Sequence, residues 1–181
     1  VRAMKMHGDG FESGGGRRPT SEELETENVE AVRAGAASNL RRHVRNLSET
    51  GIPVLVSINR FKHDTDAELD AIRQEAIDAG AREVILNEGF AKGGEGAAEL
   101  ADAVVQACAD YDAAGRPYTP IVEECMAIEE TILRVATNIY GAETVDFSDV
   151  AQKSLDSLKQ WGLGNLPVCM AKAQYSFSHE P

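Results

Sequence analysis

The pattern of apolar and polar positions divides the chain into short apolar runs and longer segments with helical spacing. The short runs predict four strands, at residues 53–58, 83–86, 144–147 and 166–171. The first run is almost continuously apolar, which is typical of a strand buried on both faces of a parallel sheet. In the other segments apolar residues recur every three or four positions, and this spacing predicts helices at residues 21–49, 65–80, 96–113, 120–140 and 148–162.

Strands that alternate with helices predict an α/β fold, with a mostly parallel sheet and helices on both of its faces. Thr65 and Glu68 have the spacing of a capping box, in which each side chain accepts a hydrogen bond from the other residue's backbone N–H. Gly51 and Gly80 are suited to end helices. In the helix at residues 96–113, the buried face is expected to consist of Leu100, Val104, Val105 and Cys108.

The amino-terminal part has a different composition. Residues 8–18, GDGFESGGGRR, are rich in glycine and charge. We therefore expect residues 1–20 to form a flexible loop and residues 21–181 to form the α/β region. The three glycines at 14–16 are not followed by Lys-Ser or Lys-Thr, which a phosphate-binding loop requires.

Composition limits the class of protein. A chain of 181 residues with 43% apolar content can bury one ordinary core. A formal charge of −12 argues against nucleic-acid binding, which needs a basic surface. The widely spaced Cys108, Cys125 and Cys169 form neither a metal-binding motif nor a disulfide framework, and the apolar runs are too short to span a membrane. We expect a soluble cytoplasmic protein with no membrane partner.

Polar clusters follow three of the predicted strands, at residues 59–61, 87–94 and 172–176. The carboxyl ends of parallel strands meet at one edge of a sheet, so these clusters can converge on one crevice and form a ligand site. Phe61 and Phe90 lie in polar surroundings within this set, and two such rings can clamp a flat heterocycle. The alternative is that both rings close over the edge of the core.

Other residues of these clusters are candidates for anion or base recognition. Gly93, Gly94 and Gly96 precede a helix and could present backbone N–H groups to an anion, although each glycine could equally serve a tight turn. Lys92 could pair with the same anion or be solvated. Asn59, at a strand end, could recognise a nucleotide base or cap the following turn.

The last cluster supplies Lys172, Gln174 and Tyr175, which could bind phosphate oxygens. No serine elbow occurs in the sequence, and the four histidines have no metal-ligand spacing. No residue is assigned to catalysis.

Six segments along the whole chain carry distinctive sequence motifs. They are VRAMKMHG at 1–8, ENVEA at 27–31, PVLVSINRF at 53–61, AKGGEGA at 91–97, IYGA at 139–142 and LPVCMAKAQYSFS at 166–178. These segments resemble those of the formate–tetrahydrofolate ligase family, and residues 166–178 closely resemble that family's LPVCMAKTQYS. Phe90 stands where the family usually has tryptophan, and Ala173 where it commonly has threonine.

This resemblance implies part of a larger enzyme of the P-loop NTPase type. The expected substrates are formate, ATP and tetrahydrofolate, and the expected ions are Mg²⁺ and a monovalent cation such as K⁺. Phe61 and Phe90 would sandwich the pterin ring, with Lys92, Gly93 and Gly94 on the folate side. Asn59, Lys172, Gln174 and Tyr175 would lie on the nucleotide side. A homo-oligomer, specifically a homotetramer, is implied.

The family proteins are longer and carry the phosphate-binding loop earlier in their sequence. No such loop occurs in these 181 residues, so we expect an internal fragment that is inactive by itself. Two alternatives remain open. One is a non-catalytic fragment that binds nucleotide or folate, and the other is a partitioning-type, P-loop-like NTPase.

Overall fold

The computed structural model describes residues 1–8 and 19–170. The predicted α/β class is confirmed. The chain divides into two units, one comprising Val1–Thr119 and the other beginning at Pro120. Within the described residues, no helix is long and apolar enough to cross a membrane.

The first unit is built around two parallel strands, β1 (Leu55–Asn59) and β2 (Glu83–Asn87). Ile58 of β1 pairs with Leu86 of β2, and Asn59 pairs with Asn87 at the carboxyl edge. Helix α5 (Asp66–Asp78) connects the two strands. It begins with the predicted capping box, since Glu68 N–H donates to Thr65 Oγ1 and Thr65 N–H donates to the Glu68 carboxylate.

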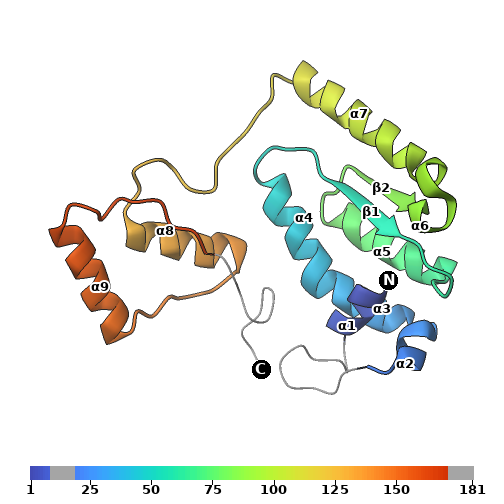
Figure 1. Cartoon of the computed structure of the whole chain (residues 1–181), viewed down its shortest axis with the longest axis horizontal. Helices are drawn as coiled ribbons and strands as arrows, with labels where there is room; N and C mark the ends of the chain where they lie inside the picture. Colours follow the sequence, from blue (N-terminus) through green and yellow to red (C-terminus); the bar gives the residue numbers. More distant parts are fainter. Residues whose placement is uncertain (9–18, 171–181) are drawn as a thin grey trace. The chain divides into compact units, whose positions relative to one another are not determined.

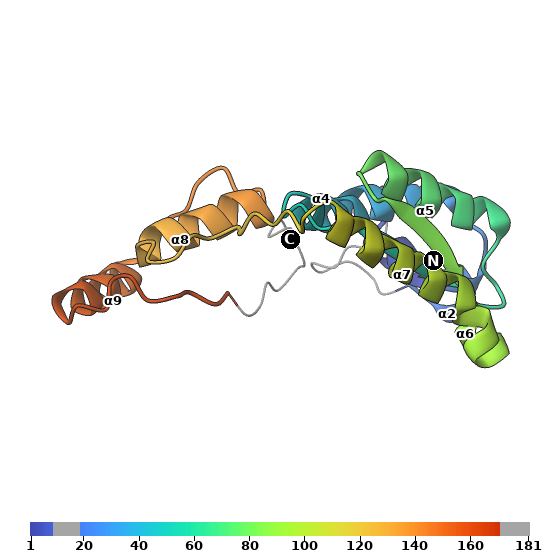
Figure 2. The same ribbon diagram turned by 90° about the horizontal axis from the view of Figure 1, so that it is seen from above.

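Helices cover both faces of this sheet, as predicted, and Figures 1 and 2 show α5 and α7 on opposite sides of the strands. On the α5 side, Ile58 packs with residues of α3 and α5, among them Val32, Leu69 and Ile72. Ile85 is also buried, and the alternation along a strand directs it to the other face. There α7 (Ala98–Ala113) contacts both strands.

The buried face of α7 differs from the prediction. Val104, Val105 and Cys108 are exposed, and Leu100 is only partly buried. Ala107 is instead the buried residue of this helix. The small side chain of Ala107 lets α7 approach the sheet closely. Close packing, rather than the hydrophobicity of the larger residues, therefore decided which side of α7 faces the sheet.

The helix predicted over residues 21–49 is interrupted, so that prediction was wrong in part. The structure has α2 (Ser21–Glu25), α3 (Val29–Gly35), a π-helical turn η1 (Ala36–Leu40) and α4 (Arg41–Ser48). The break falls at residues 26–28, where Asn28 caps α3 through a hydrogen bond from Ala31 N–H. Polar groups at the break are also bound by side chains of α1 and α5, as described below.

Helix α1 (Arg2–His7) corrects the prediction of a loop over residues 1–20. It packs against α3 at very short range, because a Cβ on Gly35 would lie 1.8 Å from the carbonyl oxygen of Met4. Lys5 of this helix is buried. Residues 9–18, on which the loop prediction mainly depended, lie outside the described residues.

The second unit contains α8 (Ile128–Arg134), a π-helical turn η3 (Val135–Ile139) and α9 (Asp149–Gln160). Ser148 caps α9, but the helix predicted from residue 120 begins only at Ile128. Residues 144–147 and 166–170 are not strands. An extended segment becomes a strand only when a neighbouring strand pairs with its backbone, and no such neighbour occurs in the described part of this unit.

Candidate ligand site at the carboxyl edge of the sheet

The strands β1 and β2 end in two asparagines whose side chains contact each other. The Asn87 Nδ2 donates a hydrogen bond to Asn59 Oδ1 over 3.0 Å. The Oδ1 of Asn87 accepts a bond of 2.9 Å from the N–H of Gly89, which begins the short helix α6 (Gly89–Lys92). Asn59 therefore has a polar partner on the neighbouring strand, while its amide can still accept and donate further bonds.

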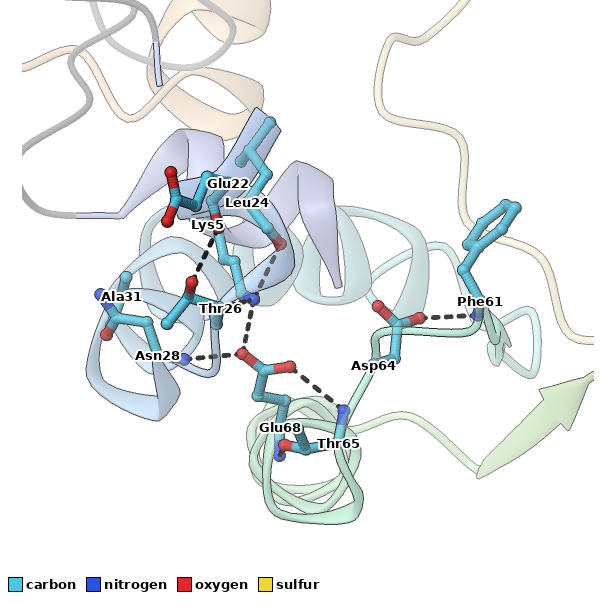
Figure 3. Close-up of polar contacts among 10 residues, drawn as sticks. All are labelled: Lys5, Glu22, Leu24, Thr26, Asn28, Ala31, Phe61, Asp64, Thr65 and Glu68. Carbon is cyan, nitrogen blue, oxygen red and sulfur yellow. Dashed lines mark hydrogen bonds and ion pairs between the residues drawn. The ribbon is translucent and has the colours of Figure 1, made fainter. Parts of the chain in front are cut away.

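The loop that follows β1 is held by its own hydrogen bonds. Phe61 N–H donates to Asp64 Oδ2 over 2.8 Å, and Asp64 N–H donates to the carbonyl oxygen of Phe61 over 3.1 Å (Figure 3). Arg60 forms an ion pair of 2.8 Å with Asp66 in the first turn of α5. These bonds fix the backbone that carries Phe61 before any ligand binds.

Phe61 and Phe90 come together at this edge, as the sequence predicted. Their ring centroids are 5.7 Å apart and their planes are tilted by 48°. Phe90 is 88% exposed and Phe61 47%, so neither ring closes over the core. A flat ligand between two ring faces needs about 7 Å, twice the contact distance of carbon atoms, so the rings must separate by about 1 Å and become parallel to sandwich it.

A cavity of about 490 Å³ lies beside these rings, within the usual size range of small-molecule sites. Cationic and anionic side chains both line it, and four segments of the chain contribute to its wall. These are helix α1, helix α2, the loop after β1, and the start of α6. The lining residues are Arg2, Leu24, Glu25, Arg60, Phe61, Lys62, His63, Asp64, Glu88, Phe90 and Ala91.

Lys92 is bound to a neighbouring carboxylate. Its Nζ lies 2.5 Å from Glu88 Oε2, one helical turn away. The hydrogen bond from Lys92 holds the pKa of Glu88 below its ordinary value. An anion that bound Lys92 would compete with Glu88, although an exposed pair of this kind is weak enough to exchange partners.

The three glycines after α6 have different structural roles. Gly93 has a φ of +64°, and its N–H donates to the carbonyl oxygen of Gly89, which supports the tight-turn interpretation. A Cβ on Gly94 would meet no atom within 4 Å. A Cβ on Gly96 would lie 2.6 Å from the carbonyl group of Glu88, so glycine is required there for close backbone contact beneath the cavity.

Lys172, Gln174 and Tyr175 lie outside the described residues, so their predicted contact with phosphate is not tested here. Among residues 1–8 and 19–170, no three His, Cys, Asp or Glu side chains are grouped to hold a metal ion.

The wall of the cavity contains residues that the sequence did not predict. Arg2, Leu24 and Glu25 belong to helices far from the strand ends in sequence, and no local pattern connects them to the site. Asp64 could have been considered, because aspartate is one of the residues enriched in turns, where its side chain binds nearby backbone groups.

A parallel α/β sheet with an aromatic-lined cavity beyond its strand ends is typical of ligand-binding α/β proteins. Residues 1–181 match the sequence model of the family described as formate–tetrahydrofolate ligase. The chain belongs to the formate–tetrahydrofolate ligase family.

Individual relatives agree with the family match. A formate–tetrahydrofolate ligase of Desulforamulus reducens is 43% identical over 184 residues, which cover 100% of this chain and 31% of the relative. A cytoplasmic C-1-tetrahydrofolate synthase of Schizosaccharomyces pombe is 40% identical and covers 100% of this chain and 19% of the relative. A formate–tetrahydrofolate ligase of Spinacia oleracea is 42% identical over 99% of this chain and 27% of its own length. The chain thus spans about a third or less of these relatives.

Proposed function

We propose that the protein containing this chain joins formate to tetrahydrofolate with the consumption of ATP, and that this chain supplies the folate side of the site. The observation that carries the proposal is the pair of exposed rings, Phe61 and Phe90, beside a cavity of about 490 Å³ at the sheet edge. Their exposure in the free protein is expected if a flat ligand covers them. Membership of the ligase family supports a pterin as that ligand.

The proposed reaction has two steps. A formate oxygen attacks the γ-phosphorus of ATP, the bond to the β-phosphate breaks, and formyl phosphate and ADP result. The N10 amine of tetrahydrofolate then attacks the formyl carbon, inorganic phosphate leaves, the amine loses a proton, and 10-formyltetrahydrofolate is formed. Both steps depend mainly on positioning the reactants and neutralising phosphate charge.

The described residues contribute to folate positioning in this proposal. Phe61 and Phe90 stack on the pterin, while Lys92 and the backbone around Gly93 and Gly94 lie on the same side of the ligand. Asn59 belongs to the nucleotide side, together with Lys172, Gln174 and Tyr175. Mg²⁺ and a monovalent cation are part of the proposal through the family, and ATP phosphates and residues beyond the described part of the chain would supply most of their ligands.

A homotetramer and a cytoplasmic location are proposed on the same family basis. The relatives in Schizosaccharomyces pombe include cytoplasmic and mitochondrial forms, so location differs between family members.

The proposal is tested with the full-length protein that contains this chain and, in parallel, with the isolated chain. The full-length protein should form ADP and 10-formyltetrahydrofolate when formate, ATP and tetrahydrofolate are all present. The isolated chain should form neither, because its 181 residues lack the glycine-rich loop and lysine that bind β- and γ-phosphates. ADP formation by the isolated chain would contradict the second expectation, and a full-length protein without ligase activity would contradict the first.

A further inference from the structure

Lys5 and Glu68 form a buried ion pair beneath the candidate site. Lys5 Nζ lies 2.7 Å from Glu68 Oε1, and the two side chains are only 1% and 0% exposed. The pair connects α1 with α5 and does not line the cavity itself. The reaction proposed above has no use for either charge.

The hydrogen-bond partners of the pair come from two stretches of the chain, residues 24–28 and Thr65 (Figure 3). Lys5 Nζ donates to the carbonyl oxygens of Leu24 and Thr26, over 3.0 and 2.8 Å, as well as to Glu68. Together these bonds use all three donors of the ammonium group.

The carboxylate of Glu68 is bound from two further directions. Glu68 Oε1 also accepts from Asn28 N–H over 2.8 Å, and Glu68 Oε2 accepts from Thr65 N–H over 3.3 Å. The interruption between α2 and α3 is therefore fixed from both sides. The carbonyl oxygens of Leu24 and Thr26 bind the ammonium group, and the N–H of Asn28 binds the carboxylate.

These bonds join two parts of the cavity lining. Leu24 and Glu25 form one part, and the loop from Arg60 to Asp64 forms another. Thr65, which donates to Glu68, directly follows that loop. Lys5 binds the backbone of Leu24, and it lies one turn from Arg2, a further lining residue. A single pair thus connects α1 and α2 with the residue that follows the Phe61 loop.

Stability alone does not explain such a pair. The free energy needed to remove two charges from water is about as large as the free energy gained from their attraction. Apolar residues of similar volume can therefore often replace a buried ion pair without a loss of folding stability. A buried pair does, however, fix geometry, because each hydrogen bond has a defined direction and length.

We propose that Lys5 and Glu68 are positioning residues that hold the Phe61 loop at the distance from α2 that tetrahydrofolate binding requires. This inference rests on the proposed function. According to this inference, the Lys5–Glu68 pair affects folate affinity separately from protein stability.

The experiment uses the full-length enzyme and four sets of variants. Lys5→Met and Glu68→Gln each leave one buried charge without its partner. The double variant Lys5→Met/Glu68→Gln removes both charges, keeps one amide oxygen for the N–H of Asn28 or of Thr65, and leaves the carbonyl oxygens of Leu24 and Thr26 without the Lys5 donor. Arg41→Met is the matched control, because it breaks the partly buried ion pair with Glu75 between α4 and α5, away from the cavity. Phe61→Ala reports on the folate site itself.

Both single variants should lower the melting temperature and raise the folate KM on the order of tenfold, with the KM values for ATP and formate unchanged. The double variant should recover part of the melting temperature, because no unpaired buried charge remains, and it should keep the raised folate KM. Arg41→Met should lower the melting temperature without changing the folate KM.

The inference is overturned if the double variant regains a normal folate KM along with its stability, or if Arg41→Met raises the folate KM equally. An equal rise in the KM for ATP would also overturn it. If Phe61→Ala raises the folate KM and the Lys5 variants do not, the inference alone is wrong. If Phe61→Ala has no effect on the folate KM, the proposed folate site is wrong as well.

Discussion

Replacing Phe61 or Phe90 by alanine should weaken folate binding by the full-length protein. A pterin between the rings would bury one face of each ring and gain a stacking contact with it. Loss of both contributions corresponds to about 1–3 kcal/mol for each ring, or roughly a ten- to hundredfold rise in the folate KM. Part of the gain is offset in the wild type, because ligand entry must first separate two rings whose centroids are 5.7 Å apart.

The exposure of the rings makes this prediction specific to binding. Phe90 is 88% exposed, so Phe90→Ala should change the melting temperature very little. Phe90→Trp should be tolerated or should lower the folate KM, because a larger ring offers more stacking area and an N–H donor. Tyr118→Ala is a suitable control, since Tyr118 is an exposed aromatic residue that does not line the cavity.

The assay is a set of steady-state constants for formate, ATP and tetrahydrofolate on these four variants. The KM values for ATP and formate should stay within about twofold of the wild type, because neither substrate is expected to contact the rings. A raised KM for ATP with an unchanged folate KM would mean that the rings clamp adenine, and the assignment of this crevice would be refuted.

Three further predictions concern folding. The isolated chain should bind a hydrophobic dye or self-associate, because Val104 and Val105 are exposed on α7 and the sheet has two strands in the described residues; a dye-silent monomer that melts sharply would contradict this. Burial opposes ionisation of Glu68, but the hydrogen bonds from Lys5, Asn28 and Thr65 outweigh it and lower the pKa below 4.5. The pair's contribution to stability should therefore be complete above about pH 4.5 and be lost as pH falls through the lower pKa of the folded state. The difference in melting temperature between wild type and Glu68→Gln should be constant above about pH 4.5 and shrink as the pH falls below it; a difference that stays constant in acid would exclude this linkage. Gly35→Ala should destabilise the protein by about 1–3 kcal/mol, because its Cβ would lie 1.8 Å from the carbonyl oxygen of Met4, and an unchanged unfolding midpoint in urea would show that α1 can move away without loss.

The sequence by itself determined the features that depend on residues close together in the chain. The apolar runs around Ile58 and Ile85 became parallel strands, and the spacing of Thr65 and Glu68 produced the capping box of α5. Phe61 and Phe90 could be placed together because both follow parallel strands, whose carboxyl ends share an edge. The family was also evident from the sequence, since whole segments matched in order.

Tertiary structure decided the features whose causes lie far apart in the chain. The break between α2 and α3 lies where Lys5 and Glu68 bind the backbone of Thr26 and Asn28, and no helical periodicity indicates those partners. Residues 144–147 have strand-like residues but no pairing partner in the described part of their unit, and a strand needs both. The presence of Leu24 and Glu25 in the lining of the cavity likewise depends on how α2 packs. Local propensity acts over a few residues, whereas a buried ion pair or a sheet partner acts across tens of residues, and only the folded chain brings those groups together.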